Sequence, residues 1–385
     1  MFIDILARIQ KPPNSTYVEI GCGFGFGVDV AVNAMRWQGR GMDPGNLAKL
    51  GKQMLGVDIQ TSYFNSTTVP DHSCDVVMAS EVLEHLADPV AFLRDVHRSL
   101  RPDGVLALTT PDVQAIHRPI EKHALRATLS VGSHLILQSQ ASLSASLRTA
   151  GFLHQVVKTN GWRITAFASG VPMKLRDDPD DRQFQVTSYL VARADARASL
   201  DDLYFGYSGR AFFEAVSGAQ WSLAQAVWTK LDPSLQTRYG IAVDEIEVPP
   251  PDAWTTPFHE LHSVMPFNLP AIMLARAYLR LNLGQSRGAI MDSSPTSLRC
   301  RKVKGRAIPE SPGGLLLISL TDWTSIKSLT PSGSCLEVRR AFRSLTFGVW
   351  KPADDKNFGC CCRRSCRCVA WSCYAQNQHG RKIFS

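Results

Sequence analysis

A turn of small residues with a carboxylate on each side is the part of the sequence best suited to chemistry. The stretch VEIGCGFGFG, residues 18–27, carries alternating glycines directly after a short apolar segment. Because glycine has no Cβ, the backbone of such a turn can approach a ligand closely. Glu19 comes two positions before Gly21, and Asp43 follows 18 residues after Gly25. A carboxylate at the position of Asp43 can accept hydrogen bonds from both hydroxyls of a ribose, so the spacing predicts a nucleoside-type ligand.

Two other interpretations of this turn compete with that one. Any glycine-rich turn between a strand and a helix has a similar sequence, and nicotinamide or flavin enzymes carry the related pattern G-x-G-x-x-G. In those enzymes the turn places a pyrophosphate at the N-terminus of the helix, where a neighbouring carboxylate is unfavourable. Glu19 suits a positively charged ligand group instead. The sequence therefore favours a cationic ligand, with a nicotinamide oxidoreductase as the weaker alternative.

A second group of reactive side chains follows the predicted strand at residues 75–78. Glu84 and His85 are adjacent just beyond this strand, and either could act as a general base. The same pair could instead begin a helix, with the carboxylate capping free backbone amides. Three further histidines could reach the same region: His117, His123 and His134. No His, Asp or Glu spacing indicates a metal site, so we expect none.

The elements that must position these side chains alternate between strand and helix over the first 110 residues. This alternation is typical of a parallel sheet with helical crossovers. We expect strands at residues 17–20, 40–42, 58–64, 75–78 and 105–109, and helices at 28–35, 46–54 and 89–100. Residues 111–135 are less regular and should cover the edge of the sheet that carries the site. A helix at 140–150 and strands at 152–157 and 186–192 should complete the domain.

The glycine turn and its carboxylates resemble the signature E/D-x-G-x-G-x-G of class I S-adenosylmethionine-dependent methyltransferases. The resemblance continues through CDVVMASEVLEHLADPVAFLRDVHRSLRPDGVLALTTPD at residues 74–112 and HLILQSQASLSASLRTAGF at 134–152, and it covers about residues 15–195. It is strongest toward the ubiquinone-biosynthesis-like and glycan-biosynthesis-associated members. It implies an α/β fold with a doubly wound, mostly parallel, seven-stranded Rossmann-like sheet. It also implies S-adenosylmethionine as the cofactor.

The same resemblance implies roles for individual residues. The glycine turn would surround the methionine part of the cofactor, Asp43 would hold its ribose, and the end of the fourth strand would border the sulfonium. The expected cofactor contacts are Glu19, Gly21, Cys22, Gly23, Gly25, Asp43, Pro44, Ser80, Glu81 and Val82. Glu84 and His85 are the expected catalytic pair. Residues 58–64 lack the family's usual acidic–apolar pair, so no residue beside the adenine is indicated.

The reaction implied by the resemblance is methyl transfer to an oxygen or nitrogen of a small-molecule, lipid or glycan acceptor. Alignment of the acceptor behind the methyl carbon would supply much of the rate, and a base would help a hydroxyl acceptor. A protein of another class, a catalytically silent scaffold with the same fold, is the alternative. The intact glycine turn and Asp43 argue against it, because a scaffold would not require them.

We expect three regions in the chain, because strand signals end at about residue 199 and charge and cysteine content change after residue 290. Residues 1–196 form the methyltransferase domain, and residues 197–290 a helical region that faintly resembles a tetratricopeptide-type repeat. Residues 1–290 contain 26 basic and 28 acidic residues, so a nucleic-acid-binding face is not indicated there. With no run of about 18 apolar residues and no secretory signal, we expect a cytoplasmic protein without a membrane span.

The tail at residues 291–385 differs from the rest of the chain. It contains 16 basic and 6 acidic residues and eight of the ten cysteines. Its cysteines could bind zinc, although none of them has the usual C-x2-C spacing, and its basic residues could contact nucleic acid. The abrupt change in composition, without a sustained period, also fits translation in another reading frame. We expect an irregular or out-of-frame tail.

Overall fold

The computed structural model describes residues 1–65, 67–117, 122–177, 179–245 and 266–284. The chain divides into two compact units, one containing Met1–Arg182 and the other beginning at Gln183. The tail predictions for residues 291–385 lie outside the described residues. Among the helices that are described, none has the length and apolar character needed to cross a membrane.

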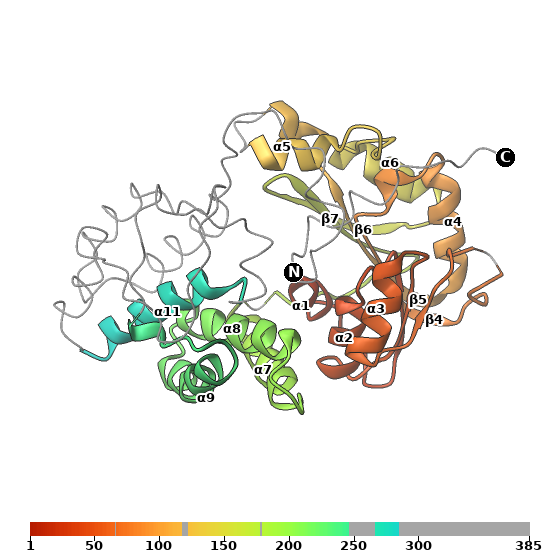
Figure 1. The fold of residues 1–385 in the computed structure, drawn as a ribbon. Helices are drawn as coiled ribbons and strands as arrows, with labels where there is room; N and C mark the ends of the chain where they lie inside the picture. Colours follow the sequence, from red (N-terminus) through yellow and green to blue (C-terminus); the bar gives the residue numbers. More distant parts are fainter. Residues whose placement is uncertain (66, 118–121, 178, 246–265, 285–385) are drawn as a thin grey trace. The chain divides into compact units, whose positions relative to one another are not determined.

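The first unit is built on one seven-stranded sheet with the strand order β3-β2-β1-β4-β5-β7-β6 (Figure 1). Its five N-terminal strands run parallel, and β7 pairs antiparallel with both β5 and β6. The strands are β1 (Thr16–Ile20), β2 (Gln38–Met42), β3 (Ile59–Gln60), β4 (Cys74–Ser80), β5 (Leu100–Pro111), β6 (His154–Asn160) and β7 (Arg163–Ser169). This confirms the predicted mostly parallel, Rossmann-like sheet.

Helices lie between the strands along the chain and cover the faces of this sheet. Leu93 and Val96 of one helix and Leu143 and Leu147 of another join a buried cluster with residues of β1, β4 and β5. The helices of this unit are α1 (Phe2–Leu6), α2 (Phe26–Asn33), α3 (Asn46–Leu55), α4 (Pro89–Ser99), α5 (Lys122–Leu129) and α6 (Gln140–Thr149), with short 3-10 helices η1 (Leu83–His85) and η2 (Val113–His117). The apolar faces of α4 and α6 thus cover the same side of the sheet.

Strand β4 is buried along most of its length because helices cover both faces of the sheet. Val76, Val77 and Met78 have no exposed surface, as expected for a central parallel strand. The helix that follows begins in a way the sequence encodes. The side chain of Asp88 accepts a 2.9 Å hydrogen bond from the amide of Ala91, and Pro89 occupies the first turn of α4.

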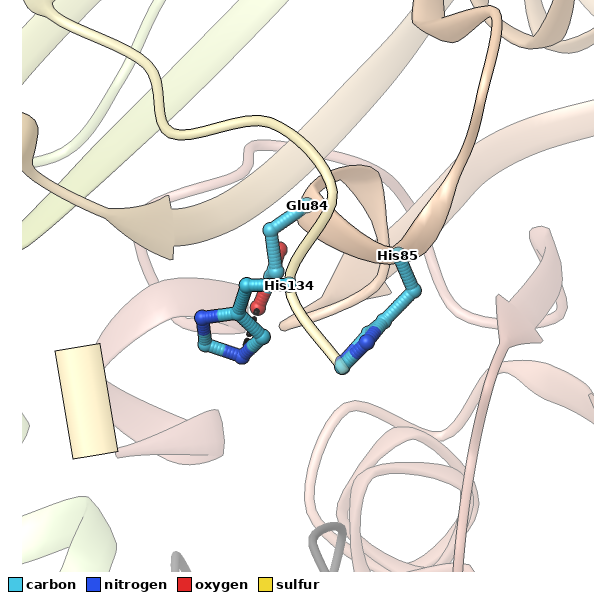
Figure 2. A group of neighbouring side chains, drawn as sticks. All are labelled: Glu84, His85 and His134. Atoms are coloured by element: carbon cyan, nitrogen blue, oxygen red, sulfur yellow. Dashed lines mark ion pairs between the residues drawn. The ribbon is translucent and has the colours of Figure 1, made fainter. Parts of the chain in front are cut away.

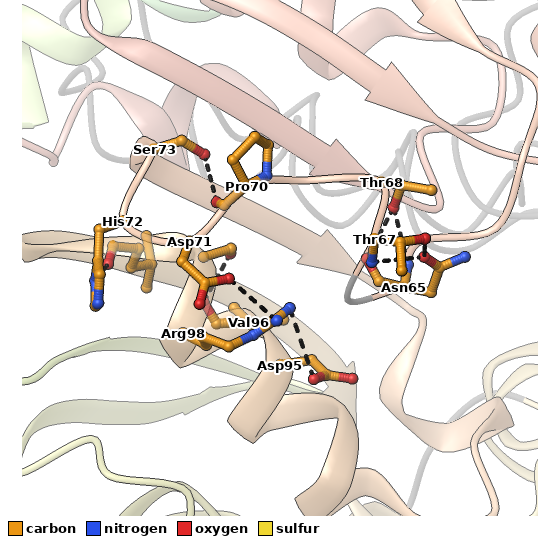
Figure 3. Close-up of polar contacts among 12 residues, drawn as sticks. Asn65, Thr67, Thr68, Pro70, Asp71, His72, Ser73, Asp95, Val96 and Arg98 are labelled. Atoms are coloured by element: carbon orange, nitrogen blue, oxygen red, sulfur yellow. Dashed lines mark hydrogen bonds and ion pairs between the residues drawn. The ribbon is translucent and has the colours of Figure 1, made fainter.

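The connection between β3 and β4 is fastened to the end of α4 by polar contacts (Figure 3). Arg98 lies 3.1 Å from the carboxylate of Asp71, and the amides of His72 and Ser73 donate to the carbonyls of Arg98 and Ser99, both at 3.0 Å. These contacts deliver the chain to the start of β4. They lie at the amino ends of the strands and therefore at the sheet edge opposite the glycine turn.

Two sequence predictions about strands were wrong. Residues 186–192 were expected to form a strand but belong to helix α7 (Pro179–Asp195). Their β-branched and aromatic residues favour a strand locally, yet Thr187, Leu190 and Ala194 are buried at helical spacing. The expected strand at 58–64 is limited to Ile59–Gln60, because Asn65 and Thr68 form a tight turn soon afterwards. Strand β7 was not predicted.

The described elements of the second unit are all helices. Its described elements are α7, α8 (Asp202–Ser217), α9 (Trp221–Tyr239), η3 (Val243–Glu245) and α11 (Leu269–Asn282). Helix α8 packs against α9 and α11. Gly209 permits a close approach, since a Cβ there would lie 1.9 Å from the side-chain nitrogen of Asn268, which donates to the carbonyl of Phe205 at 3.0 Å. The core of this unit therefore depends on a small residue in the middle of α8.

Candidate functional site

The candidate site lies at the carboxyl ends of the parallel strands. The strand order reverses direction between β1 and β4, and open α/β sheets bind their ligands at such a switch point. The glycine turn follows β1 there, Asp43 follows β2, and Glu81 follows β4. Residues 60 positions apart in the sequence are thereby brought to one edge of the sheet.

The glycine turn uses its three glycines in different ways. All three have positive φ, at 68° for Gly21, 53° for Gly23 and 90° for Gly25, a conformation that other residues adopt only with strain. A Cβ at Gly21 would lie 2.6 Å from Val82, and one at Gly25 would lie 2.6 Å from Ile59. A Cβ at Gly23 would meet no atom within 4 Å. The middle glycine therefore faces open space, on the side where a ligand can approach.

Asp43 is bonded directly to this turn. Its Oδ2 accepts a 2.9 Å hydrogen bond from the amide of Gly23, and its Oδ1 accepts a 2.7 Å bond from the amide of Gly45. A carboxylate offers about four acceptor positions, so each oxygen keeps capacity for a further donor. Pro44, the next residue, is exposed. The turn and the acid after β2 form one hydrogen-bonded unit.

Glu19 lies beneath the turn rather than at its surface. Its side chain is buried, and a Cβ at Gly27 would lie 2.3 Å from its Oε2, so the glycine in α2 makes room for the carboxyl group. Burial raises the pKa of Glu19 to about 8, against an ordinary value of 4.5. Its Oε2 has no hydrogen-bond partner among the described residues. A direct contact between Glu19 and a ligand stays a prediction.

Cys22 packs into the sheet from within the turn. The residue is buried, and its Sγ occupies the space that a Cβ at Gly41 would enter at 2.6 Å. Burial raises the pKa of the Cys22 thiol far above its usual value, which makes the group unreactive. Only the backbone of Cys22 forms part of the turn, because its side chain is buried. A ligand contact by Cys22 would therefore involve main-chain atoms.

The end of β4 carries a chain of polar contacts. Ser80 Oγ lies 2.9 Å from Thr109 Oγ1, which donates to Glu81 Oε1 at 2.8 Å. Arg163 Nε lies 3.0 Å from the same oxygen of Glu81. Glu81 has a φ of 56°, in the left-handed region that non-glycine residues rarely occupy. Strained backbone of this kind is concentrated at functional sites.

Glu84 is fully buried in η1. Its Oε2 accepts a 3.0 Å hydrogen bond from Thr110 Oγ1. Burial and the neighbouring Glu81 carboxylate raise the pKa of Glu84 to about 8. Its carbonyl accepts hydrogen bonds from the amides of Leu135, at 2.7 Å, and Ile136, at 3.2 Å. The N-cap residue of η1 is Val82, and it makes no side-chain cap hydrogen bond.

Of the further candidate histidines, His134 joins Glu84 and His85 (Figure 2). One ligand-type atom from each of the three residues lies within 4.8 Å of the other two. The rings of His85 and His134 meet edge to face with centroids 4.9 Å apart, and His134 Nε2 lies 4.0 Å from Glu84 Oε1. His117 is exposed at the end of η2, and the side chain of His123 lies outside the described residues.

Arg163 is a site residue that the sequence reasoning missed. It begins β7, which pairs with the end of β5 in antiparallel register and so reaches the same sheet edge. Its guanidinium lies 4.5 Å from the ring centroid of Trp162. The ion pair with Glu81 spans 82 residues of sequence, and no local pattern marks it. Detecting it requires the register of β5 and β7.

Comparison with known proteins agrees with this geometry. Residues 2–157 match the family model described as a methyltransferase domain. A Mycolicibacterium smegmatis protein named "Probable S-adenosylmethionine-dependent methyltransferase" is 33% identical over 35% of this chain and 51% of its own. A ubiquinone biosynthesis O-methyltransferase of Parvibaculum lavamentivorans is 28% identical over 34% and 51%. A trans-aconitate 2-methyltransferase of Methylobacterium nodulans is 26% identical over 50% and 83%. The chain spans about half the length of the first two relatives.

Proposed function

Since residues 2–157 match a family model described as a methyltransferase domain, we propose that this protein is a class I, S-adenosylmethionine-dependent methyltransferase that transfers a methyl group to a small-molecule, lipid or glycan acceptor. The atom that receives the methyl group is an oxygen or a nitrogen. The observation that carries the proposal is the bond from the amide of Gly23 to Asp43, which joins a ligand-accessible turn to a carboxylate suited to a ribose.

The chemistry of the site residues fits this cofactor. S-adenosylmethionine carries a ribose diol, a positively charged sulfur and an amino-acid part without phosphate. The turn offers open space beside Gly23, and the nearby side chains of Asp43 and Glu81 are acidic. Carboxylates attract a cation and repel a pyrophosphate. This donor and acceptor set therefore favours the sulfonium compound over a dinucleotide.

The chain's own residues have separate tasks in this proposal. When bound, the cofactor supplies an activated methyl group on sulfur. Asp43 and the turn fix the direction of that methyl group, and the end of β4 borders it through Ser80, Glu81 and Val82. His85 takes the proton of an acceptor hydroxyl, and Glu84 supports it from the buried side of η1. Holding donor and acceptor in line supplies much of the rate.

The tautomer of His85 supports its assignment as the base. Its Nδ1 lies 3.0 Å from the carbonyl oxygen of Ser133, which can only accept a hydrogen bond. The carbonyl favours a proton on Nδ1 of the neutral ring and a lone pair on Nε2, and the Ser133 hydroxyl, 3.3 Å from the same Nδ1, can act as donor or acceptor. A base needs that lone pair to take a proton from an acceptor.

A labelling experiment tests the proposed activity. Purified protein is incubated with methyl-labelled S-adenosylmethionine and fractionated small-molecule, lipid and glycan extracts, and label transfer and S-adenosylhomocysteine formation are measured. We expect transfer that falls at least tenfold in Asp43→Asn and is unchanged in Asp103→Asn, an exposed carboxylate at the opposite sheet edge. Tight cofactor binding without transfer to any fraction would instead support the silent scaffold.

A further inference from the structure

The hydrogen bonds at the end of β4 run in one direction. Thr109 Oγ1 donates to Glu81 Oε1 at 2.8 Å, because a carboxylate can only accept. A hydroxyl carries one hydrogen, so Thr109 has none left for Ser80. The 2.9 Å contact between Ser80 Oγ and Thr109 Oγ1 must therefore be donated by Ser80. The hydrogens of both hydroxyls thus point along the chain of contacts, from Ser80 through Thr109 to Glu81.

This direction leaves acceptor oxygens, and no donor hydrogen, on Ser80 and Glu81. The oxygen of Ser80 keeps its lone pairs after its hydrogen has been donated. Glu81 Oε1 receives Thr109 and lies 3.0 Å from Arg163 Nε, whereas Oε2 has no donor in the described part of the chain. Both side chains are partly exposed at the ligand edge of the sheet. A ligand group can therefore complete their hydrogen bonding only by donating.

Thr109 fixes both the main chain and the side chain of Glu81. Strands β4 and β5 place Ser80 opposite Thr109 in their parallel register. The carbonyl of Thr109 accepts a 2.9 Å hydrogen bond from the amide of Glu81, next to the contact that its hydroxyl makes. Glu81 has a φ of 56°, so neighbouring structure must hold it in this uncommon conformation. Thr109 is itself buried and supplies that support from within the sheet.

The charges at this end of β4 disfavour an anionic ligand group. The guanidinium of Arg163 is paired with Glu81 and lies 4.5 Å from the ring centroid of Trp162. Its charge is therefore offset by Glu81. A ligand carboxylate would place its own acceptors against those of Ser80 and Glu81, where no hydrogen lies between them. A hydroxyl or an amine would supply the missing hydrogen.

We propose that Ser80 and Glu81 form a subsite that only accepts hydrogen bonds, with Thr109 as its positioning residue, and that it binds the methyl acceptor through a hydroxyl or an amine rather than a carboxylate. The inference rests on the proposed function and narrows its substrate class. Transfer to a hydroxyl breaks the carbon–sulfur bond of the donor, forms a carbon–oxygen bond and passes the hydroxyl proton to His85. A carboxylate is already ionised at neutral pH and would leave that base without a task.

The chemical stability of the methylated product tests the substrate class. Material labelled by the purified protein is treated with mild alkali, which hydrolyses methyl esters to methanol and leaves methyl ethers and methylamines intact. We expect the label to stay on the product. Release of the label as methanol would show that a carboxylate had been methylated and would overturn the inference.

Substitutions at Thr109 test its positioning role. Thr109→Val keeps the shape of the side chain and removes the hydroxyl, whereas Thr109→Ser keeps the hydroxyl. We expect methyl transfer to fall about tenfold or more in Thr109→Val and to recover in Thr109→Ser, while the affinity for S-adenosylhomocysteine changes less than about threefold in both. Thr149→Val, which removes an exposed hydroxyl from α6, is the matched control. Failure of Thr109→Ser to recover, or an equal loss of affinity that would assign the subsite to the cofactor's ammonium, would contradict the proposal.

Nuclear magnetic resonance of the full chain tests the subsite without turnover, with phenol and benzoate as probes that share a ring. Phenol should shift the amide signals of Ser80 and Glu81, and benzoate should leave them in place. The response to phenol should be lost in Thr109→Val and kept in Thr109→Ser, and thermal unfolding verifies that each variant is folded. An equal response to benzoate, or none to phenol, would refute the inference. Failure of the methyl-transfer proposal would appear separately, as absence of binding to S-adenosylhomocysteine.

Discussion

The amide of Gly23 donates a 2.9 Å hydrogen bond to Oδ2 of Asp43, so the glycine turn and the acid after β2 move as one unit. The two residues lie in different βα connections of the sheet. A ligand that displaces either one must therefore adjust the other. A ligand that contacted both the turn and the acid would meet one prearranged geometry.

Substitutions at two glycines of the turn should affect ligand binding and stability to different extents. Gly23→Ala places a methyl group in open space beside the turn, whereas Gly21→Ala drives one into Val82. We expect Gly23→Ala to weaken S-adenosylhomocysteine binding at least tenfold while lowering stability by about 1–2 kcal/mol from the positive φ alone. Gly21→Ala should lower stability further. Calorimetry and thermal unfolding measure the two effects, and equal losses in both variants would contradict the assignment of Gly23 to the ligand side.

A glycine outside the turn, in helix α3, should also be sensitive to substitution. Gly51 lies inside α3, where Gly→Ala ordinarily stabilises a helix by about 1 kcal/mol. Here a Cβ at Gly51 would lie 1.8 Å from the carbonyl oxygen of Phe24 in the turn. We therefore expect Gly51→Ala to lower the melting temperature and to weaken cofactor binding. Lys49→Ala, at an exposed position of the same helix, is the control, and a raised melting temperature for Gly51→Ala would refute the prediction.

The buried carboxyl group of Glu19 should shape the pH dependence of stability. Its pKa is about 8 in the folded chain and 4.5 ordinarily, so the folded state binds the extra proton between these values. The contribution of Glu19 to the unfolding free energy should therefore be highest below about pH 4.5 and should fall as the pH rises toward 8. Glu19→Gln should flatten this contribution. Denaturant unfolding at several pH values, without cofactor, provides the comparison with Glu19→Gln, and an unchanged slope would contradict the burial argument.

The ion pair at the end of β4 should matter for turnover more than for cofactor binding. Arg163 lies beside Glu81, whose backbone is held in the left-handed region. Arg163→Met keeps much of the length of the side chain but removes its charge. We expect S-adenosylhomocysteine affinity to change less than threefold and methyl transfer to fall about tenfold or more, because Glu81 loses its charged partner at the end of β4. A matched loss of affinity would instead place Arg163 on the cofactor side.

Much of the fold could be predicted because its signals are local. The glycine turn, the buried strand at residues 75–78 and the amphipathic helix at residues 89–100 are each indicated by a few neighbouring residues. Helix α7 could not, since the β-branched residues near Thr187 favour a strand and only tertiary packing reveals the helical spacing of its buried side chains. Strand β7 was missed although part of its pairing is local, since it forms an antiparallel hairpin with β6 across Gly161 and Trp162.

The site was predictable to a similar extent. Asp43 and the turn follow strand ends, so their meeting at one edge of the sheet can be deduced. The meeting of His134 with Glu84 cannot, because an irregular segment sets it and the two residues are 50 positions apart. The burial of Glu19 likewise depends on the absence of a Cβ at Gly27, a relation between a strand and the next helix.

The most direct test of the account is calorimetric titration of the purified chain with S-adenosylhomocysteine and, separately, with NAD. We predict that S-adenosylhomocysteine binds with a Kd on the order of micromolar, which corresponds to a binding free energy of about −8 kcal/mol. This binding should be lost in Asp43→Ala, and NAD should not bind. Binding of NAD in the absence of any response to S-adenosylhomocysteine would contradict the central claim.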